Sequence, residues 1–368
     1  MRAQSILTLV VLIVLSSGPS ITNRIRAKNS TAGRKIPSER PLEFLFTTKV
    51  KQAVILKKLY SLLVAFLMVN CTIYFQFNPS YATPSMSSPF DAARIHPGFN
   101  FAVVGDMGCS SMAQKVINHI NNKTPKLILA LGDLSYQRSN ADCWLNIVSP
   151  IESKMKIVLG DHDYESDFLL KQYKSYFNLS QEYYSFNYEN VHFMALATEI
   201  PFDMKSSQYN FIKNDLEAVS KNSEIKWIIV FSYRPQYSSP TKHPGNADIR
   251  AIYHPLFEKY QVDIVLQAHN HNYQRTYPVN YNQVESSSPI VTDNNPKTYE
   301  DPVAPLYITV GTGGATLHKF KGKESYVAAQ YLGFGFLDIS ITNNSRNLTG
   351  TFYDSSDGTI EDHFTVIK

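Results

Sequence analysis

The stretch Leu127-Ile-Leu-Ala-Leu-Gly-Asp-Leu-Ser-Tyr136 decides the fold, because an apolar run of strand type ends there in a Gly-Asp pair. The same pattern, a strand-like run followed by Asp or His, recurs in Phe101–Asp106, Lys156–Asp161 and Asp263–His269. In α/β folds, ligands bind at the carboxyl ends of strands, so we expect these polar side chains to meet at one edge of a sheet. Carboxylates and imidazoles gathered there are the ligands that hard metal ions require.

A single Gly-Asp pair is more often a tight turn than a metal ligand, because Gly supplies positive φ and Asp bonds its own backbone. Three such pairs after apolar runs, followed by His269 and His271 after a fourth run, favour a metal centre instead. The spacing of the two histidines directs both side chains to the same side of an extended segment. The order Asp, Asp, Asp-His, His-x-His therefore predicts a two-metal site that hydrolyses phosphate esters.

Four motifs carry a resemblance to a known family, and they are Gly105–Gly108, Gly132–Tyr136, Gly160–Asp163 and Ala268–His271. Their order and spacing resemble the signature of the calcineurin-like metallophosphoesterases. Tyr136 is similar to a tyrosine that marks the purple acid phosphatase branch of that family. The resemblance extends over residues 98–340. It implies an α/β fold of the α+β sandwich type, with two packed mixed β-sheets flanked by helices.

The resemblance also implies a dinuclear centre, in which a ferric ion lies beside a divalent ion of iron, zinc or manganese. The residues that would bind the ferric ion are Asp106, Asp133, Tyr136 and His271. Asp133 would bridge the two ions, and Asp161 and His269 would be further ligands of the divalent ion. The implied activity is that of an acid phosphatase, which hydrolyses phosphate monoesters with a hydroxide formed at the dinuclear centre.

Two histidines are candidate catalytic residues. His162 resembles the family's histidine that bonds substrate phosphate and protonates the leaving alkoxide. His243 lies ten residues beyond Tyr233, where the family often carries another substrate-contacting histidine, but its loop composition fits a surface histidine equally well. The sequence has no Walker-type phosphate loop and no Gly-x-Ser-x-Gly elbow, which argues against nucleotide-dependent transfer and serine hydrolysis.

Two residues depart from the family's pattern at the second ion. Asp161 replaces an asparagine, and Tyr233 replaces a histidine ligand. Tyr233 either ligates as a phenolate, against a reference pKa of about 10, or packs as an aromatic wall with water in the vacant position. The aromatic wall would favour a degenerate relative that binds metal or phosphate without catalysis. A phosphodiesterase or nucleotidase on the same site is a further alternative to the phosphomonoesterase.

Composition indicates a catalytic domain, residues 98–368, behind an N-terminal targeting region, residues 1–82, and a linker, residues 83–97. The chain of 368 residues is 43% apolar, which is enough for a sizeable core. Its net charge of +4 is uneven, because residues 1–58 carry eleven Lys or Arg and two acids, and the remainder is net acidic. A nucleic-acid-binding footprint is therefore not apparent, and a phosphate ester is the expected ligand.

The uncharged stretch Leu59–Phe77 is long enough to span a bilayer, and small residues precede a potential cleavage point after Ala82. We expect a signal peptide or a membrane anchor, which places the domain outside the cytoplasm, secreted or tethered to the outer face of the membrane. Because this stretch and its flanks form a complete signal by themselves, we hypothesise that residues 1–49 do not belong to the native chain. In an oxidising compartment, Cys109 and Cys143 form a plausible disulfide, and the alternative is two unpaired buried thiols.

The hydrophobic pattern predicts alternating strands and helices in the domain. Strands are expected at 100–105, 127–131, 156–159, 227–231 and 263–267, and helices at 111–121, 143–153, 166–176, 207–220 and 247–260. Further strands are expected in a hairpin at 183–198 and at 306–310, 334–342, 348–353 and 364–367. The polar segment 281–302 is expected to form a loop over the site.

Overall fold

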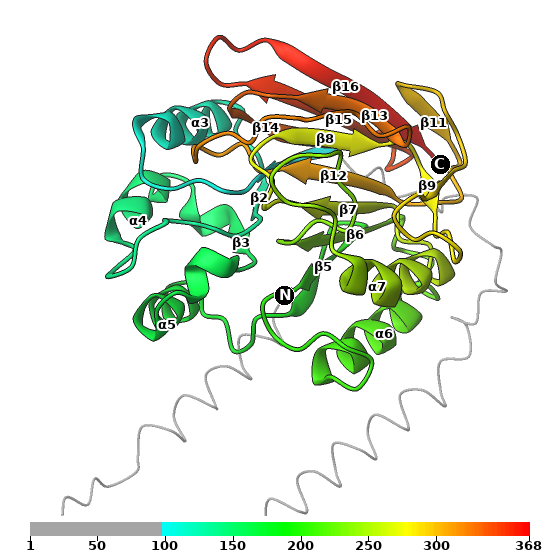
Figure 1. Ribbon diagram of the computed structural model, residues 1–368, viewed down its shortest axis with the longest axis horizontal. Helices are drawn as coiled ribbons and strands as arrows, with labels where there is room; N and C mark the ends of the chain where they lie inside the picture. The colour runs from blue at the N-terminus through cyan, green and yellow to red at the C-terminus, as the bar shows by residue number, and fades with distance from the viewer. Residues whose placement is uncertain (1–97) are drawn as a thin grey trace, which may run out of the picture. The chain divides into compact units, whose positions relative to one another are not determined.

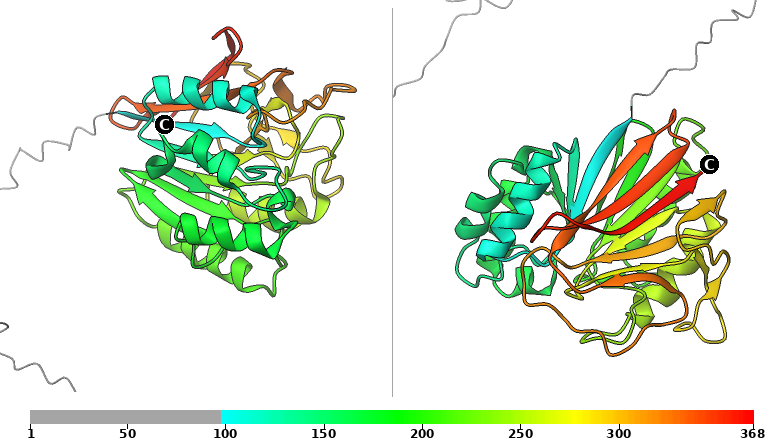
Figure 2. Two further views of the ribbon diagram at one scale, coloured as in Figure 1. Left: turned by 90° about the vertical axis from the view of Figure 1, so that its left-hand side faces the viewer. Right: turned by 90° about the horizontal axis from the view of Figure 1, so that it is seen from above.

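The computed structural model describes residues 98–368, which form two large β-sheets with helices on their outer faces (Figure 1, Figure 2). The predicted targeting region and linker lie outside the described residues. Within the described part of the chain, no helix is both long and apolar enough to cross a bilayer. The predicted α/β architecture, with two mixed sheets flanked by helices, is confirmed.

The first sheet has seven strands in the order β11-β16-β15-β14-β1-β2-β3. Its parallel part consists of β1 (Phe99–Val104), β2 (Leu127–Ala130) and β3 (Met155–Ile157). Its antiparallel part consists of β14 (Gly335–Thr342), β15 (Asn347–Asp354) and β16 (Ile360–Ile367), and the short β11 (Thr298–Glu300) pairs with β16. Because β1, β2 and β3 are parallel, their carboxyl ends, each followed by a Gly-Asp motif, lie at the same edge.

The second sheet also has seven strands, in the order β13-β8-β12-β7-β6-β5-β4. The predicted hairpin is present as β4 (Tyr184–Tyr188) and β5 (Val191–Leu196), and the parallel strands are β5, β6 (Trp227–Ser232), β7 (Ile264–Gln267) and β12 (Leu306–Val310). Two strands that the sequence did not predict, β8 (Tyr273–Thr276) and β13 (Val327–Tyr331), complete the sheet. A small separate ladder joins β9 (Val279–Asn280) to β10 (Ile290–Val291).

Five α-helices cover the outer faces in the described chain. They are α3 (Ser111–Asn122), α4 (Asp142–Val148), α5 (Asp167–Tyr176), α6 (Ser207–Val219) and α7 (Ala247–Lys259). Four begin at a Ser or Asn whose side chain accepts a hydrogen bond from a backbone N–H in the first turn; these caps are Ser110, Ser166, Ser206 and Asn246. Such caps satisfy N–H groups that have no partner inside the helix, so the sequence defines these helix starts locally.

Three apolar layers hold the fold together. They form because successive side chains along a strand point to opposite faces of its sheet. In β1, Phe101 and Val103 point into the core between the two sheets, whereas Ala102 and Val104 point towards α3 and α4. In the second sheet, the side chains of β6 also alternate between the core between the sheets and an outer apolar layer, which packs on α6 and α7. Burying each large apolar side chain stabilises the fold by about 1.5–3 kcal/mol, so these near-continuous apolar runs suit strands covered on both faces.

A buried ion pair joins the two sheets directly. Arg275 on β8 places Nε 2.6 Å and Nη2 2.9 Å from the carboxylate of Asp362 on β16. The guanidinium also donates to the hydroxyl of Tyr299, at 2.6 Å, and only 1% of the Arg275 side chain is exposed. The bidentate geometry and the extra donor bond compensate for removing both charges from water.

The structure differs from the sequence prediction in two segments. Helix α4 ends at Val148 rather than near residue 153, because Pro150 cannot continue a helix and a separate short 3₁₀ turn, Glu152–Lys154, follows it. The segment 281–302 does not lie over the metal motifs: it packs along α7 and β16, where the backbone N–H of Thr365 donates to the carbonyl of Lys297 at 2.7 Å. Its expected role as a cover for the site is therefore wrong.

Candidate metal centre

The predicted ligands follow the carboxyl ends of β1, β2, β3, β6 and β7, and the backbone at several of them is unusual. Four of them adopt left-handed conformations: φ is 54° at Asp106, 51° at Asp133, 55° at Tyr136 and 67° at His269. Non-glycine residues seldom occupy this region, and such conformations gather at functional sites. The loops after β1 and β2 support each other, because the Asp106 N–H donates to the carbonyl of Gly132 at 3.0 Å.

One set of donor atoms forms a tight triangle. The Tyr136 hydroxyl oxygen lies 3.0 Å from Asp106 Oδ1 and 2.9 Å from His271 Nε2, and these last two atoms are 3.3 Å apart. Adjacent ligands of one ion with bonds of 2.0–2.1 Å are separated by about 2.8–3.4 Å, so this triangle fits one coordination sphere. His271 Nδ1 donates to the carbonyl of Thr316 at 2.6 Å, which leaves Nε2 for the ion. Oxygen-rich donors including a phenol suit a ferric ion.

Asp133 lies between this triangle and the second predicted position. Its Oδ1 accepts a hydrogen bond from the backbone N–H of His162 at 3.0 Å, and its Oδ2 lies 2.5 Å from the hydroxyl of Tyr233. Burial, reinforced by the nearby carboxylates of Asp106 and Asp163, raises the pKa of Asp133 to about 10. The buried carboxyl of Asp133 therefore resists ionisation, and a bound metal ion would stabilise its charged form.

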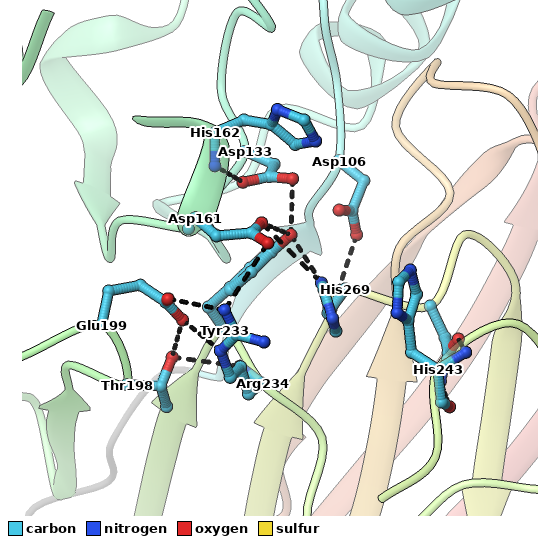
Figure 3. Close-up of polar contacts among 12 residues, drawn as sticks. Asp106, Asp133, Asp161, His162, Thr198, Glu199, Tyr233, Arg234, His243 and His269 are labelled. Atoms are coloured by element: carbon cyan, nitrogen blue, oxygen red, sulfur yellow. Dashed lines mark hydrogen bonds and ion pairs between the residues drawn. The ribbon is translucent and has the colours of Figure 1, made fainter. Parts of the chain in front are cut away.

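The second predicted position is filled by a protein atom (Figure 3). The Tyr233 hydroxyl oxygen lies 2.5 Å from Asp133 Oδ2, 2.8 Å from Asp161 Oδ1 and 2.8 Å from His269 Nδ1. Asp161 Oδ1 and His269 Nδ1 are themselves 3.9 Å apart, with the phenol oxygen between them. Adjacent ligands of one ion are closer than this, at about 2.8–3.4 Å. The residues expected to hold a divalent ion thus do not fit it in this arrangement.

Arg234, the residue after Tyr233, brings a positive charge to the same place. Its guanidinium binds Glu199 through two donors, at 2.6 and 2.7 Å, and lies 3.5 Å from Asp161 Oδ2. Partial burial opposes ionisation of Asp161, but the hydrogen bond from Tyr233 and the nearby His269 and Arg234 hold its pKa below the usual value. Arg234 and Glu199 were not predicted as site residues, since neither belongs to a metal-binding motif.

His162 lies at the mouth of the site with its ring oriented by a carboxylate. Its Nδ1 lies 2.5 Å from Glu165, which Arg138 holds in turn through a 2.9 Å contact. The ring lies 4.6 Å from that of Tyr136, and 43% of the side chain is exposed. A pocket of about 480 Å³ opens here, lined among others by Tyr136, His162, Lys242 and His271. His162 is thus accessible to a substrate in a way that the buried ligands are not.

Two more histidines border the site. The ring of His243 lies 4.0 Å from that of His269, and its backbone carbonyl accepts a hydrogen bond from the side chain of Asn270 at 2.8 Å, so it belongs to the site rather than to a distant surface. His318 was not predicted; its ring stacks on His271 at 3.8 Å, and burial lowers its pKa to about 3. His318 lies four residues after Gly311-Thr-Gly-Gly314, and no motif in the sequence marks it as a site residue.

Comparison with known proteins agrees with this geometry. The calcineurin-like phosphoesterase family matches residues 99–273, and the family described as iron/zinc purple acid phosphatase-like protein C matches residues 304–363. Purple acid phosphatase 22 of Arabidopsis thaliana is 27% identical over 70% of this chain and 59% of its own length. Purple acid phosphatase 15 of the same plant is 30% identical over 61% of this chain and 47% of its own length. The chain thus spans about half the length of these relatives.

Among solved structures, the fold is similar to that of a purple acid phosphatase from yellow lupin seeds. The two share 21% sequence identity with a TM-score of 0.62, and the alignment covers 74% of this chain and 54% of the lupin chain. At this level of identity, the similarity bears on the fold alone.

Proposed function

Because the chain belongs to the calcineurin-like phosphoesterase family, with the C-terminal part of the purple acid phosphatases, we propose that it hydrolyses phosphate monoesters at an iron site. The observation that carries this proposal is the triangle of Asp106, Tyr136 and His271 donor atoms, with Asp133 beside it. These residues would hold a ferric ion, which would supply Lewis acidity for a phosphate ester and for a water molecule. The pocket beside the triangle is wide enough for a phosphate group.

His162 is the residue that handles the leaving group. Glu165 accepts the Nδ1 proton of His162, which fixes the tautomer and leaves the other ring nitrogen free. Protonated on both nitrogens, the ring can bond a phosphate oxygen and give a proton to the departing alkoxide. Lys242 at the rim and His243 beside His269 add positive or hydrogen-bonding groups for the remaining phosphate oxygens.

Steady-state hydrolysis of p-nitrophenyl phosphate tests this function. We expect His162→Asn to lower kcat by roughly 10²–10⁴-fold, as for the loss of a general acid. The matched control is His363→Asn, because His363 lies on β16 away from the site, with its Nδ1 3.1 Å from the hydroxyl of Thr351. Equal losses in both variants, or no iron-dependent turnover in the wild type, would contradict the proposal. Comparison with bis(p-nitrophenyl) phosphate separates monoesterase from diesterase activity.

We also propose that the domain works outside the cytoplasm. The support is the disulfide between Cys109 and Cys143, a bond that persists mainly in oxidising compartments. Protease treatment of intact cells should digest a C-terminally tagged chain, or the tagged chain should be recovered from the medium. Protection of the tag until the cells are lysed would contradict this location.

A second candidate function is phosphate binding without turnover, and Tyr233 is the observation that favours it. Its hydroxyl fills the position at which the family's divalent ion would help to activate the nucleophile. Isothermal titration calorimetry with inorganic phosphate would then show binding to the iron-loaded chain, while p-nitrophenyl phosphate stays intact. Turnover that His162→Asn abolishes would exclude this candidate.

A further inference from the structure

We propose that Tyr233 and Arg234 together take the place of the second metal ion, so that this chain holds a single ion. The inference rests on the proposed function for the first ion, at Asp106, Tyr136 and His271, and concerns what lies beside it. The Tyr233 hydroxyl oxygen is within 2.8 Å of all three side chains expected to hold the second ion. Figure 3 shows it at the point where these side chains converge.

Tyr136 and Tyr233 occupy different positions relative to their partners. Tyr136 is placed as a ligand of an ion, whereas Tyr233 is placed where an ion itself would lie. Tyr136 is one corner of a triangle whose edges are 2.9, 3.0 and 3.3 Å, and an ion can bind on the face of that triangle. Tyr233 instead lies at the centre of its partners, two of which, Asp161 and His269, are 3.9 Å apart on either side of it. The centre of a ligand set is the position of the ion itself.

The ring of Tyr233 is held in its position by close packing. It is fully buried, and it packs against the backbone of two glycines, Gly132 and Gly160. A Cβ atom added to either glycine would lie 2.8 or 2.7 Å from a carbon of the Tyr233 ring, so the sequence keeps this space free for the ring. The backbone N–H of Ala268 donates to the carbonyl of Tyr233 at 2.8 Å and fixes its main chain as well.

Hydrogen bonding and charge supply what an ion would otherwise provide. The phenol has a single proton, which is shared between the carboxyl groups of Asp133 and Asp161, and it offers a lone pair to the Nδ1–H of His269, so each expected ligand has a polar partner. Arg234, with Nη2 at 3.5 Å from Asp161, balances the carboxylate that replaces the family's asparagine. The two departures, Asp161 and Tyr233, therefore form one self-consistent polar network together with Arg234.

Metal content of the purified full-length chain, loaded with iron and zinc, tests the inference. We expect one ion per chain in the wild type, bound as iron and coloured by the Tyr136 phenolate. Its electron paramagnetic resonance should be that of an isolated ferric ion. Tyr233→His removes the phenol and restores a ligand, so the content should rise from one ion to two. Tyr233→Phe keeps the ring and removes only the hydroxyl, so the content should stay at one.

Two ions per wild-type chain would overturn the inference, and a fall from two to one in Tyr233→Phe would identify Tyr233 as a ligand. A second ion bound instead by Asp133, Asp161 and His162, whose ligand atoms lie within 4.8 Å of one another, would equally overturn it. If Tyr233→His does not fold, the wild type and Tyr233→Phe still decide the question. One bound ion without hydrolysis would contradict the proposed function and leave this inference intact.

Discussion

Removing the disulfide should cost a defined amount of stability and leave the metal centre in place. Cys109 follows the first metal motif directly, and Cys143 lies in the first turn of α4, with 34 residues of separation between them. The chain-entropy relation for a loop of this length gives about 4 kcal/mol at 25 °C. We therefore expect the variant Cys109→Ser/Cys143→Ser to lose roughly this free energy of unfolding.

The metal centre should survive because other contacts hold the loop. The N–H groups of Asp106, Met107 and Gly108 bond the carbonyls of the second motif at 3.0, 3.1 and 2.9 Å, independently of the disulfide. Iron content and the visible absorption band should thus stay unchanged in the double variant at low denaturant.

Urea unfolding followed by tryptophan fluorescence measures the effect, since Trp144 and Trp227 are both buried. The wild type in reducing agent should have the same free energy of unfolding as the double variant. As the control, Cys71→Ser should have the same free energy of unfolding as the oxidised wild type. If the free energies of unfolding of the oxidised wild type and the double variant differ by less than about 1 kcal/mol, the loop-entropy reasoning is refuted. Two free thiols in the unfolded, unreduced domain would refute the pairing itself.

Three other perturbations test the fold and the site. Asp362→Ala strands the buried charge of Arg275 and should destabilise the fold by about 3–5 kcal/mol in urea unfolding, whereas Asp362→Leu combined with Arg275→Met should recover most of that loss. Gly160→Ala places a Cβ 2.2 Å from Asp133 Oδ1, so the iron content should fall while the circular dichroism spectrum keeps its native shape. Tyr136→Phe should abolish the visible absorption band without changing the midpoint of unfolding of the apo-protein; a retained band would assign the colour to another group.

The sequence was sufficient to predict the strands and helix starts that local residue patterns define. The apolar runs before Asp106, Asp133 and His269 are buried on both faces, so each could be recognised as an inner strand from composition alone. Because strands β1 and β2 are parallel neighbours, the meeting of their motifs at one edge followed from topology. The helix starts at Ser or Asn caps followed from hydrogen-bonding chemistry.

What the sequence could not supply depends on three-dimensional proximity. The hydroxyl of Tyr233 reaches its three partners only because Gly132 and Gly160, remote in sequence, leave room for the ring. His318 contacts His271 through ring stacking between segments 47 residues apart, for which no spacing rule exists. Strand β8 was missed because its residues, Tyr-Gln-Arg-Thr, are buried largely as paired polar groups instead of an apolar run.

The left-handed backbone at Asp106 and Asp133 restricts what mutation can do at the centre. Asparagine and aspartate tolerate this conformation far better than β-branched or bulky residues, so Asn is the substitution that preserves both shape and loop. Each Asp→Asn exchange keeps a side chain of the same shape and removes a carboxyl group that can carry negative charge. Electrostatic attraction for a cation can therefore be adjusted in single steps on an unchanged framework, which makes this domain a suitable scaffold for engineering graded metal affinity.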